Sequence, residues 1–100
     1  MNIRFLEIAQ IELDEAIKYY NSESAGLGDS FLLDAINAIE RIKHFTNAWH
    51  PFSDNTRRCQ LRRFPYGIIY QITNTEILVV AVAHLHRNPD YWQQRITQQN

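Results

Sequence analysis

Two apolar runs in the second half of the chain constrain the fold most. Residues 68–72 and 77–83 are rich in β-branched side chains, and four polar residues, 73–76, separate them. Apolar β-branched runs joined by a short polar turn are typical of an antiparallel hairpin. The second run is apolar on both of its faces, as in a central strand that is flanked by neighbours and covered on each side. We therefore expect this hairpin to form the middle of a sheet.

A basic segment, residues 57–64, precedes the hairpin and alternates in polarity. Cys59 and Leu61 fall on one face, which we expect to contact helices. The side chains on the other face are polar: Arg58, Gln60 and Arg62. Cys59 is the single cysteine, and its place in a strand predicts a small buried residue rather than a catalytic thiol.

The first half of the chain predicts a strand followed by two helices. Residues 2–6 alternate polar and apolar side chains, while residues 7–23 carry apolar ones at helical spacing. Gly26 supplies a left-handed stop, and Asp29 or Ser30 caps a second helix. Two helices joined so tightly run antiparallel. The pattern predicts an α+β fold in which an N-terminal strand and a helical hairpin pack on an antiparallel β-sheet.

Length and composition predict a single domain, residues 1–100. The chain has 100 residues and 45% hydrophobic content, which suffices for one compact core. No apolar stretch approaches the roughly 18–20 residues that span a membrane, and no signal segment opens the chain. We expect a soluble cytoplasmic protein that makes no membrane contact.

Three carboxylates on the first helix raise the question of acid–base chemistry. Glu12, Asp14 and Glu15 are interpreted as lying opposite the apolar stripe, where nothing would bury them and raise a pKa. We therefore predict a solvated helix face. The polar segment 46–56 is broken by a proline and is expected to be a loop, with Trp49 covering one end of the core.

The charge of −1 hides an asymmetry between the two halves. Residues 1–56 hold four Lys/Arg against nine Asp/Glu, a net −5, whereas residues 57–100 hold six Arg against two acids, a net +4. Arginine suits bidentate contact with phosphate or carboxylate, so Arg58, Arg62 and Arg63 predict an anionic partner. The alternative is a strand edge that is charged to prevent aggregation.

The two histidines that follow the central strand, His84 and His86, share a face. Two imidazoles are too few for a zinc site, and a third ligand would have to come from His44 or His50. We therefore expect no metal and no other cofactor.

The same segment allows two further interpretations. One is acid–base work on RNA, for which His84, Arg87 and Tyr91 supply the usual side-chain types. The other is structural: Trp92 and Tyr91 fold back on the sheet, and Arg87 pairs with Asp90.

The order of these elements and three segments within them resemble the RelE/ParE family of toxins from bacterial toxin–antitoxin modules. The segments are YYNSESAGLGDSFL, RRFPYGIIYQI and VVAVAHLHRNPDYW, and the resemblance covers nearly the whole chain. It implies two N-terminal helices against an antiparallel sheet. It also implies a cognate antitoxin, usually encoded next to the toxin, that wraps it with an extended or helical segment.

The two branches of this family differ in mechanism. RelE-like members cut messenger RNA on the ribosome with an arginine that corresponds to Gly67 of this chain. A nuclease would here depend on His84, Arg87 and Tyr91. ParE-like members share the FPY segment and the AVAH ending, and inhibit DNA gyrase by binding. The missing arginine favours the ParE branch and a binding inhibitor over an enzyme.

The resemblance thus implies the growth-inhibiting toxin of a type II toxin–antitoxin, or plasmid stabilisation, system. Its partners would be the antitoxin and either DNA gyrase or the ribosome with its mRNA. Five side chains are candidates for partner contact: Arg58, Arg62, Arg63, His86 and Trp92. Two assemblies stay open, a homo-oligomer and a hetero-oligomer with the antitoxin.

Overall fold

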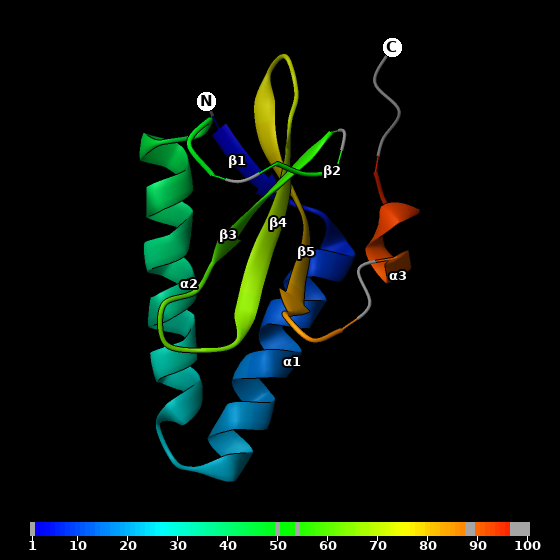
Figure 1. Cartoon of the computed structure of the whole chain (residues 1–100). Coiled ribbons are helices and arrows are strands. Elements are labelled where there is room, and N and C mark those ends of the chain that lie inside the picture. The colour runs from blue at the N-terminus through cyan, green and yellow to red at the C-terminus, as the bar shows by residue number, and fades with distance from the viewer. Residues whose placement is uncertain (1, 50, 54, 88–89, 97–100) are drawn as a thin grey trace.

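The computed structural model describes residues 2–49, 51–53, 55–87 and 90–96. Its elements follow one another in the order β1 (Asn2–Phe5), α1 (Glu7–Glu23), α2 (Leu27–His44), β2 (Pro51–Ser53), β3 (Thr56–Gln60), β4 (Tyr66–Ile72), β5 (Glu76–His84) and α3 (Asp90–Gln93). The sheet order is β1-β5-β4-β3-β2, so the expected central strand, β5, lies between β1 and β4 (Figure 1). The predicted α+β class is confirmed. Among the described residues, no helix has the length and apolar content to cross a membrane.

The predicted hairpin of β4 and β5 is confirmed, and its turn is closed by a hydrogen bond from Thr73 N–H to the Glu76 carbonyl oxygen at 2.9 Å. Strand β1 runs parallel to β5, so the sheet is mixed. This pairing stops at Val79, whose carbonyl accepts the Leu6 N–H at 2.9 Å before the chain turns into α1. The rest of β5 on that side has no neighbouring strand in the described residues.

The sheet separates two apolar layers. Figure 1 shows α1 and α2 as an antiparallel hairpin on one side and α3 on the other. The helix side is filled by buried side chains that include Phe31, Cys59 and Tyr70, whereas Ile69 and Trp92 lie in the layer under α3. The predicted burial of Cys59 is confirmed, and this burial raises the pKa of its thiol. The thiol therefore stays protonated and serves as packing.

The junction between α1 and α2 differs from its prediction. Gly26 has the expected left-handed backbone, with φ of 85°, but α2 begins directly after it. The prediction that Asp29 or Ser30 caps the helix is therefore wrong, because both lie inside its first turn. The N–H groups in the first turn of a helix have no acceptor within the helix. Asn21 provides one for Gly28, because its side-chain oxygen accepts the Gly28 N–H at 2.8 Å.

The segment between α2 and β3 was expected to be a loop, and this prediction is wrong in part. Its residues 51–53 form β2, which pairs with the start of β3. An edge strand tolerates a proline because one side of it makes no ladder hydrogen bonds. Trp49 packs against the helix-side core as predicted, and its Nε1 donates to the Arg41 carbonyl at 3.4 Å. Strand β3 ends at Gln60, four residues before the predicted boundary.

Candidate functional site

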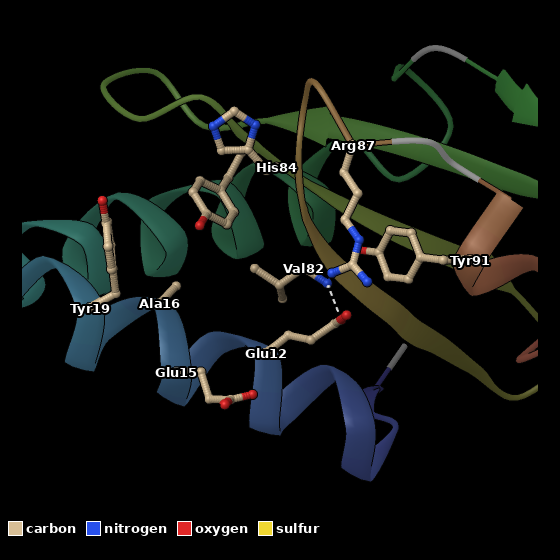
Figure 2. A pocket seen from close by; sticks show the side chains of 9 residues that line it. Glu12, Glu15, Ala16, Tyr19, Val82, His84, Arg87 and Tyr91 are labelled. Atoms are coloured by element: carbon tan, nitrogen blue, oxygen red, sulfur yellow. Dashed lines mark hydrogen bonds between the residues drawn. The ribbon is translucent and has the colours of Figure 1, made fainter.

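A cleft of about 260 Å³ lies between α1, the end of β5 and the segment that leads to α3. We call it the His84 cleft (Figure 2). Its walls carry two carboxylates, three tyrosines, a histidine and an arginine beside two small apolar side chains. The lining residues are Glu12, Glu15, Ala16, Tyr19, Tyr66, Val82, His84, Arg87 and Tyr91. The three predicted catalytic residues are therefore brought together.

His84 is oriented by two neighbours. It is the register partner of Tyr66 on β4, and the two rings meet edge to face with centroids 5.2 Å apart. The His86 N–H donates to Nδ1 of His84 at 3.1 Å. Neutral His84 therefore carries its ring proton on Nε2, because Nδ1 acts as the acceptor.

The pair His84 and His86 does not acquire a third ligand in the described part of the chain. Their ring centroids lie 5.2 Å apart, yet no group of three His, Cys, Asp or Glu with metal-site geometry occurs there. His50, one of the two histidines considered for this role, lies outside the described residues.

Arg87 and Tyr91 form the other wall of the cleft. The guanidinium carbon of Arg87 lies 3.7 Å from the Tyr91 ring centroid, and Figure 2 shows the two side chains next to each other. Burial, and then the negative charge of Glu12, raise the pKa of Tyr91 to about 12, although Arg87 and Arg95 oppose the shift. Tyr91 is therefore a hydrogen-bond donor and not a base. The side chain of Asp90, the predicted partner of Arg87, lies outside the description.

Glu12 forms the floor of the cleft, and its predicted solvation is wrong. Its carboxylate makes a two-point ion pair with Arg95, Oε1 to Nη1 at 2.9 Å and Oε2 to Nη2 at 3.1 Å. The same Oε1 accepts the Val82 N–H at 3.0 Å, and Arg95 also donates to the Val80 carbonyl at 3.1 Å. Both side chains are only about one-seventh exposed, at 15% and 14%. The two side chains thus satisfy backbone groups on the part of the β5 edge that does not pair with β1.

Helical spacing explains why most of the Glu12 side chain is shielded from solvent. It lies three residues after Ala9 and four before Ala16, both of which are buried, so it belongs to the apolar face rather than to the opposite one. This spacing was the available signal for Glu12, whereas nothing in the sequence identified Arg95 as its partner. Asp14 and Glu15 are exposed, as predicted.

Arg58 lies on the sheet face opposite the helical hairpin, as its alternation predicted. Its aliphatic stem covers Gly67, where an added Cβ would come within 2.9 Å of Cγ and Cδ of Arg58. Its guanidinium carbon lies 4.4 Å from the ring centroid of Phe52 on β2. The space above Gly67 is thus occupied by the side chain of an arginine from the neighbouring strand.

Arg62 and Arg63 are exposed in the turn between β3 and β4. Their backbone N–H groups donate to the two carboxylate oxygens of Asp34, at 3.1 and 2.8 Å. Asp34 is 4% exposed on α2, and the sequence interpretation missed it. Its signal was the same as that of Glu12, because it lies three residues after the buried Phe31 and four before the buried Ala38.

Two candidates for partner contact remain, Trp92 and His86. Trp92 is 1% exposed and stacks on Phe52 with centroids 5.5 Å apart, so it folds back on the sheet as the structural interpretation expected. His86 is exposed beside His84. The five candidates therefore do not all belong to an exposed surface, because Trp92 is buried.

The fold matches that of a solved toxin–antitoxin structure. Over 86% of this chain and 97% of the other, it superposes with a TM-score of 0.66 and 15% sequence identity on a chain of the chromosomal ParDE TA system from P. aeruginosa. At this level of identity, the likeness shows a shared fold.

Sequence comparison is more specific. Residues 3–89 match the model of the ParE toxin of type II toxin–antitoxin system, parDE. Over 80 residues, the chain is 31% identical to Toxin ParE2 of Mycobacterium tuberculosis, in strains CDC 1551 / Oshkosh and ATCC 25618 / H37Rv. This match covers 79% of the chain and 76% of the relative. The protein belongs to the ParE toxin family.

Proposed function

We propose that this protein arrests growth by binding DNA gyrase in the cytoplasm, and that a cognate antitoxin neutralises it. The observation that carries the proposal is the family match over residues 3–89, because ParE-like toxins are gyrase inhibitors. A binding inhibitor needs a stable surface and no acid–base constellation. The degree of growth inhibition would then depend on the fraction of gyrase molecules to which the protein is bound.

Two features of the His84 cleft and its surroundings support binding over catalysis. Gly67 offers no guanidinium to a phosphate, and the stem of Arg58 fills the space above it. The Arg58 guanidinium contacts Phe52 and does not line the His84 cleft.

The test compares two purified systems. The protein is expected to block ATP-dependent supercoiling of relaxed plasmid by gyrase and to leave cell-free translation intact. Protein that has been unfolded by heat provides the control for nonspecific inhibition. Blocked translation with normal supercoiling would reject the gyrase proposal.

The antitoxin is the second expected partner. Co-expression with the product of the adjacent reading frame should restore growth, and the purified pair should restore supercoiling. Light scattering on the toxin alone and on the pair distinguishes a homo-oligomer from a toxin–antitoxin hetero-oligomer. Failure of any neighbouring product to relieve growth arrest would contradict this part of the proposal.

One observation favours a second candidate, a ribosome-dependent mRNA endonuclease. His84, Arg87 and Tyr91 line the same cleft, where they offer a base, a cation for the phosphate and a neutral acid. This candidate predicts that His84→Ala and Arg87→Gln each abolish toxicity and mRNA cleavage while the domain stays folded. Arg4→Gln removes the same charge outside the cleft and serves as the matched control. Unchanged growth arrest in the two cleft variants would reject the nuclease.

A further inference from the structure

A second cleft, about 500 Å³ in volume, lies beside the outer edge of β3 and is separate from the His84 cleft. We call it the Arg62 cleft. Three of its six lining residues are arginines, one is a tryptophan and none is acidic. The lining residues are Arg41, Trp49, Arg58, Gln60, Leu61 and Arg62. In the described residues, strand β2 pairs only with Thr56 and Arg57, so the remainder of the β3 edge is open to a ligand.

The tryptophan of this cleft is held in place by its surroundings. Arg57 Nη1 donates to the carbonyl oxygens of Asn47 and Trp49, at 3.1 and 2.8 Å, and so ties the loop to β3. The indole N–H donates to the Arg41 carbonyl at 3.4 Å. Trp49 packs against the helix-side core and also lines the cleft. It therefore presents a fixed aromatic surface to any ligand there.

The arginines are positioned without being neutralised. Arg41 Nη2 donates to the Gln60 carbonyl at 2.9 Å, and its guanidinium carbon lies 6.0 Å from the Trp49 ring centroid. The backbone of Arg62 is fixed by Asp34, while its side chain is exposed. Among the described residues, neither these two arginines nor Arg58 forms an ion pair with a carboxylate. Their charges thus remain available to an anion.

We propose that the Arg62 cleft binds single-stranded nucleic acid, with one unpaired base on Trp49 and the flanking phosphates on Arg41, Arg58 and Arg62. Guanidinium groups bind phosphate oxygens through paired N–H donors, and unpaired bases stack on aromatic side chains whatever their sequence. An acidic peptide would satisfy the arginines, but it brings a flat ring only where it carries an aromatic residue, whereas every nucleotide carries both a phosphate and a base. The inference goes beyond gyrase inhibition, which requires only a protein partner.

The experiment measures fluorescence anisotropy of a short labelled oligothymidylate titrated with the full chain. Three phosphate contacts predict that the logarithm of the association constant falls with the logarithm of salt with a slope of about −2. Arg62→Gln is expected to weaken binding about tenfold at low salt and to reduce the slope by about 0.7. The matched control is Arg63→Gln, which removes the same charge one residue outside the cleft lining and should change binding less than about twofold.

Tryptophan fluorescence provides an independent readout of stacking. Trp92 is 1% exposed and shielded from a ligand, so quenching by the oligonucleotide should come from Trp49. Trp49→Leu is expected to abolish the quenching and weaken binding. Trp49→Phe should retain much of the affinity, because phenylalanine still offers a ring. Circular dichroism of each variant checks the fold.

Three results would overturn the inference: no binding of the oligonucleotide, equal losses in the Arg62 and Arg63 variants, or stronger binding of a polyglutamate peptide of matched charge. Parallel titrations with oligouridylate and oligothymidylate show whether RNA or DNA is preferred. These measurements need no gyrase, so their outcome is independent of the supercoiling assay.

Discussion

Replacing Glu12 by glutamine tests whether the Glu12–Arg95 pair holds the C-terminal segment on the domain. The amide has nearly the shape of the carboxylate, and its oxygen still accepts the Val82 N–H. What it loses is the charge that neutralises Arg95, together with one of the two hydrogen bonds from the guanidinium. The substitution therefore leaves a mostly buried cation without its counter-ion.

The magnitude follows from the burial of the pair. Removal of one partner from a fully buried ion pair costs about 3–5 kcal/mol, whereas an exposed pair is worth about 0–1 kcal/mol. Because the two side chains are 15% and 14% exposed and the Val82 contact survives, we expect Glu12→Gln to lower the free energy of unfolding by about 2–3 kcal/mol. This is a large part of the roughly 5–15 kcal/mol that a small domain has.

Urea denaturation followed by circular dichroism measures this loss. With a urea dependence of about 1–1.5 kcal/mol per molar for a chain of this size, the midpoint should fall by about 1.3–3 M. Glu15→Gln is the matched control, because Glu15 is exposed on the same helix, and its midpoint should stay within about 0.5 M. An equally small effect of Glu12→Gln would refute this reasoning and would support the prediction that Glu12 lies on a solvated helix face.

Two further substitutions test buried polar contacts. Asp34→Asn places an N–H₂ group where two backbone donors converge, so it should cost about 1–3 kcal/mol in urea unfolding and speed amide exchange of Arg62 and Arg63 by NMR. Burial raises the pKa of Tyr70 from 10.0 to about 12, and its hydroxyl donates to the Thr46 carbonyl. Since the folded state holds this proton more tightly, the contribution is complete below pH 10 and is lost as the pH approaches 12. Tyr70 should account for about 2–3 kcal/mol of the loss in stability over that interval, so Tyr70→Phe should lose less than the wild type by that amount in urea titrations at each pH. Equal losses in the two proteins would contradict this.

The elements of this fold were predictable because their signals are local. The hairpin of β4 and β5 follows from two β-branched runs around a polar turn, and α1 follows from helical spacing between Ala9 and Ala16. The parallel pairing of β1 was not predictable in this way, because it joins residues more than seventy positions apart. The cap of α2 was missed for a related reason, since its acceptor comes from Asn21 in the preceding helix.

The candidate site was predictable to a smaller extent. His84, Arg87 and Tyr91 were identified from their chemistry, and they do line one cleft. Glu12 and Asp34 were missed although each occupies a position on the buried face of its helix. Their partners are backbone amides of distant segments, which no local pattern reveals. A carboxylate within an apolar helical stripe is nevertheless a usable signal, because burial of a charge is tolerated only where donors meet it.

The crowding between Gly67 and Arg58 yields a prediction whose sign depends on a second residue. In the wild type, Gly67→Ala would place a Cβ 2.9 Å from Cγ and Cδ of Arg58, so the stem must shift and the guanidinium must leave Phe52. We expect a destabilisation of about 1–2 kcal/mol, as for other overpacked sites. In an Arg58→Ala background the obstacle is gone, and alanine should stabilise the strand by about 0.5–1 kcal/mol because glycine loses more backbone entropy on folding. Urea unfolding of the four proteins gives both values. Equal effects of Gly67→Ala in the two backgrounds would show that the Arg58 stem does not fill the space above Gly67.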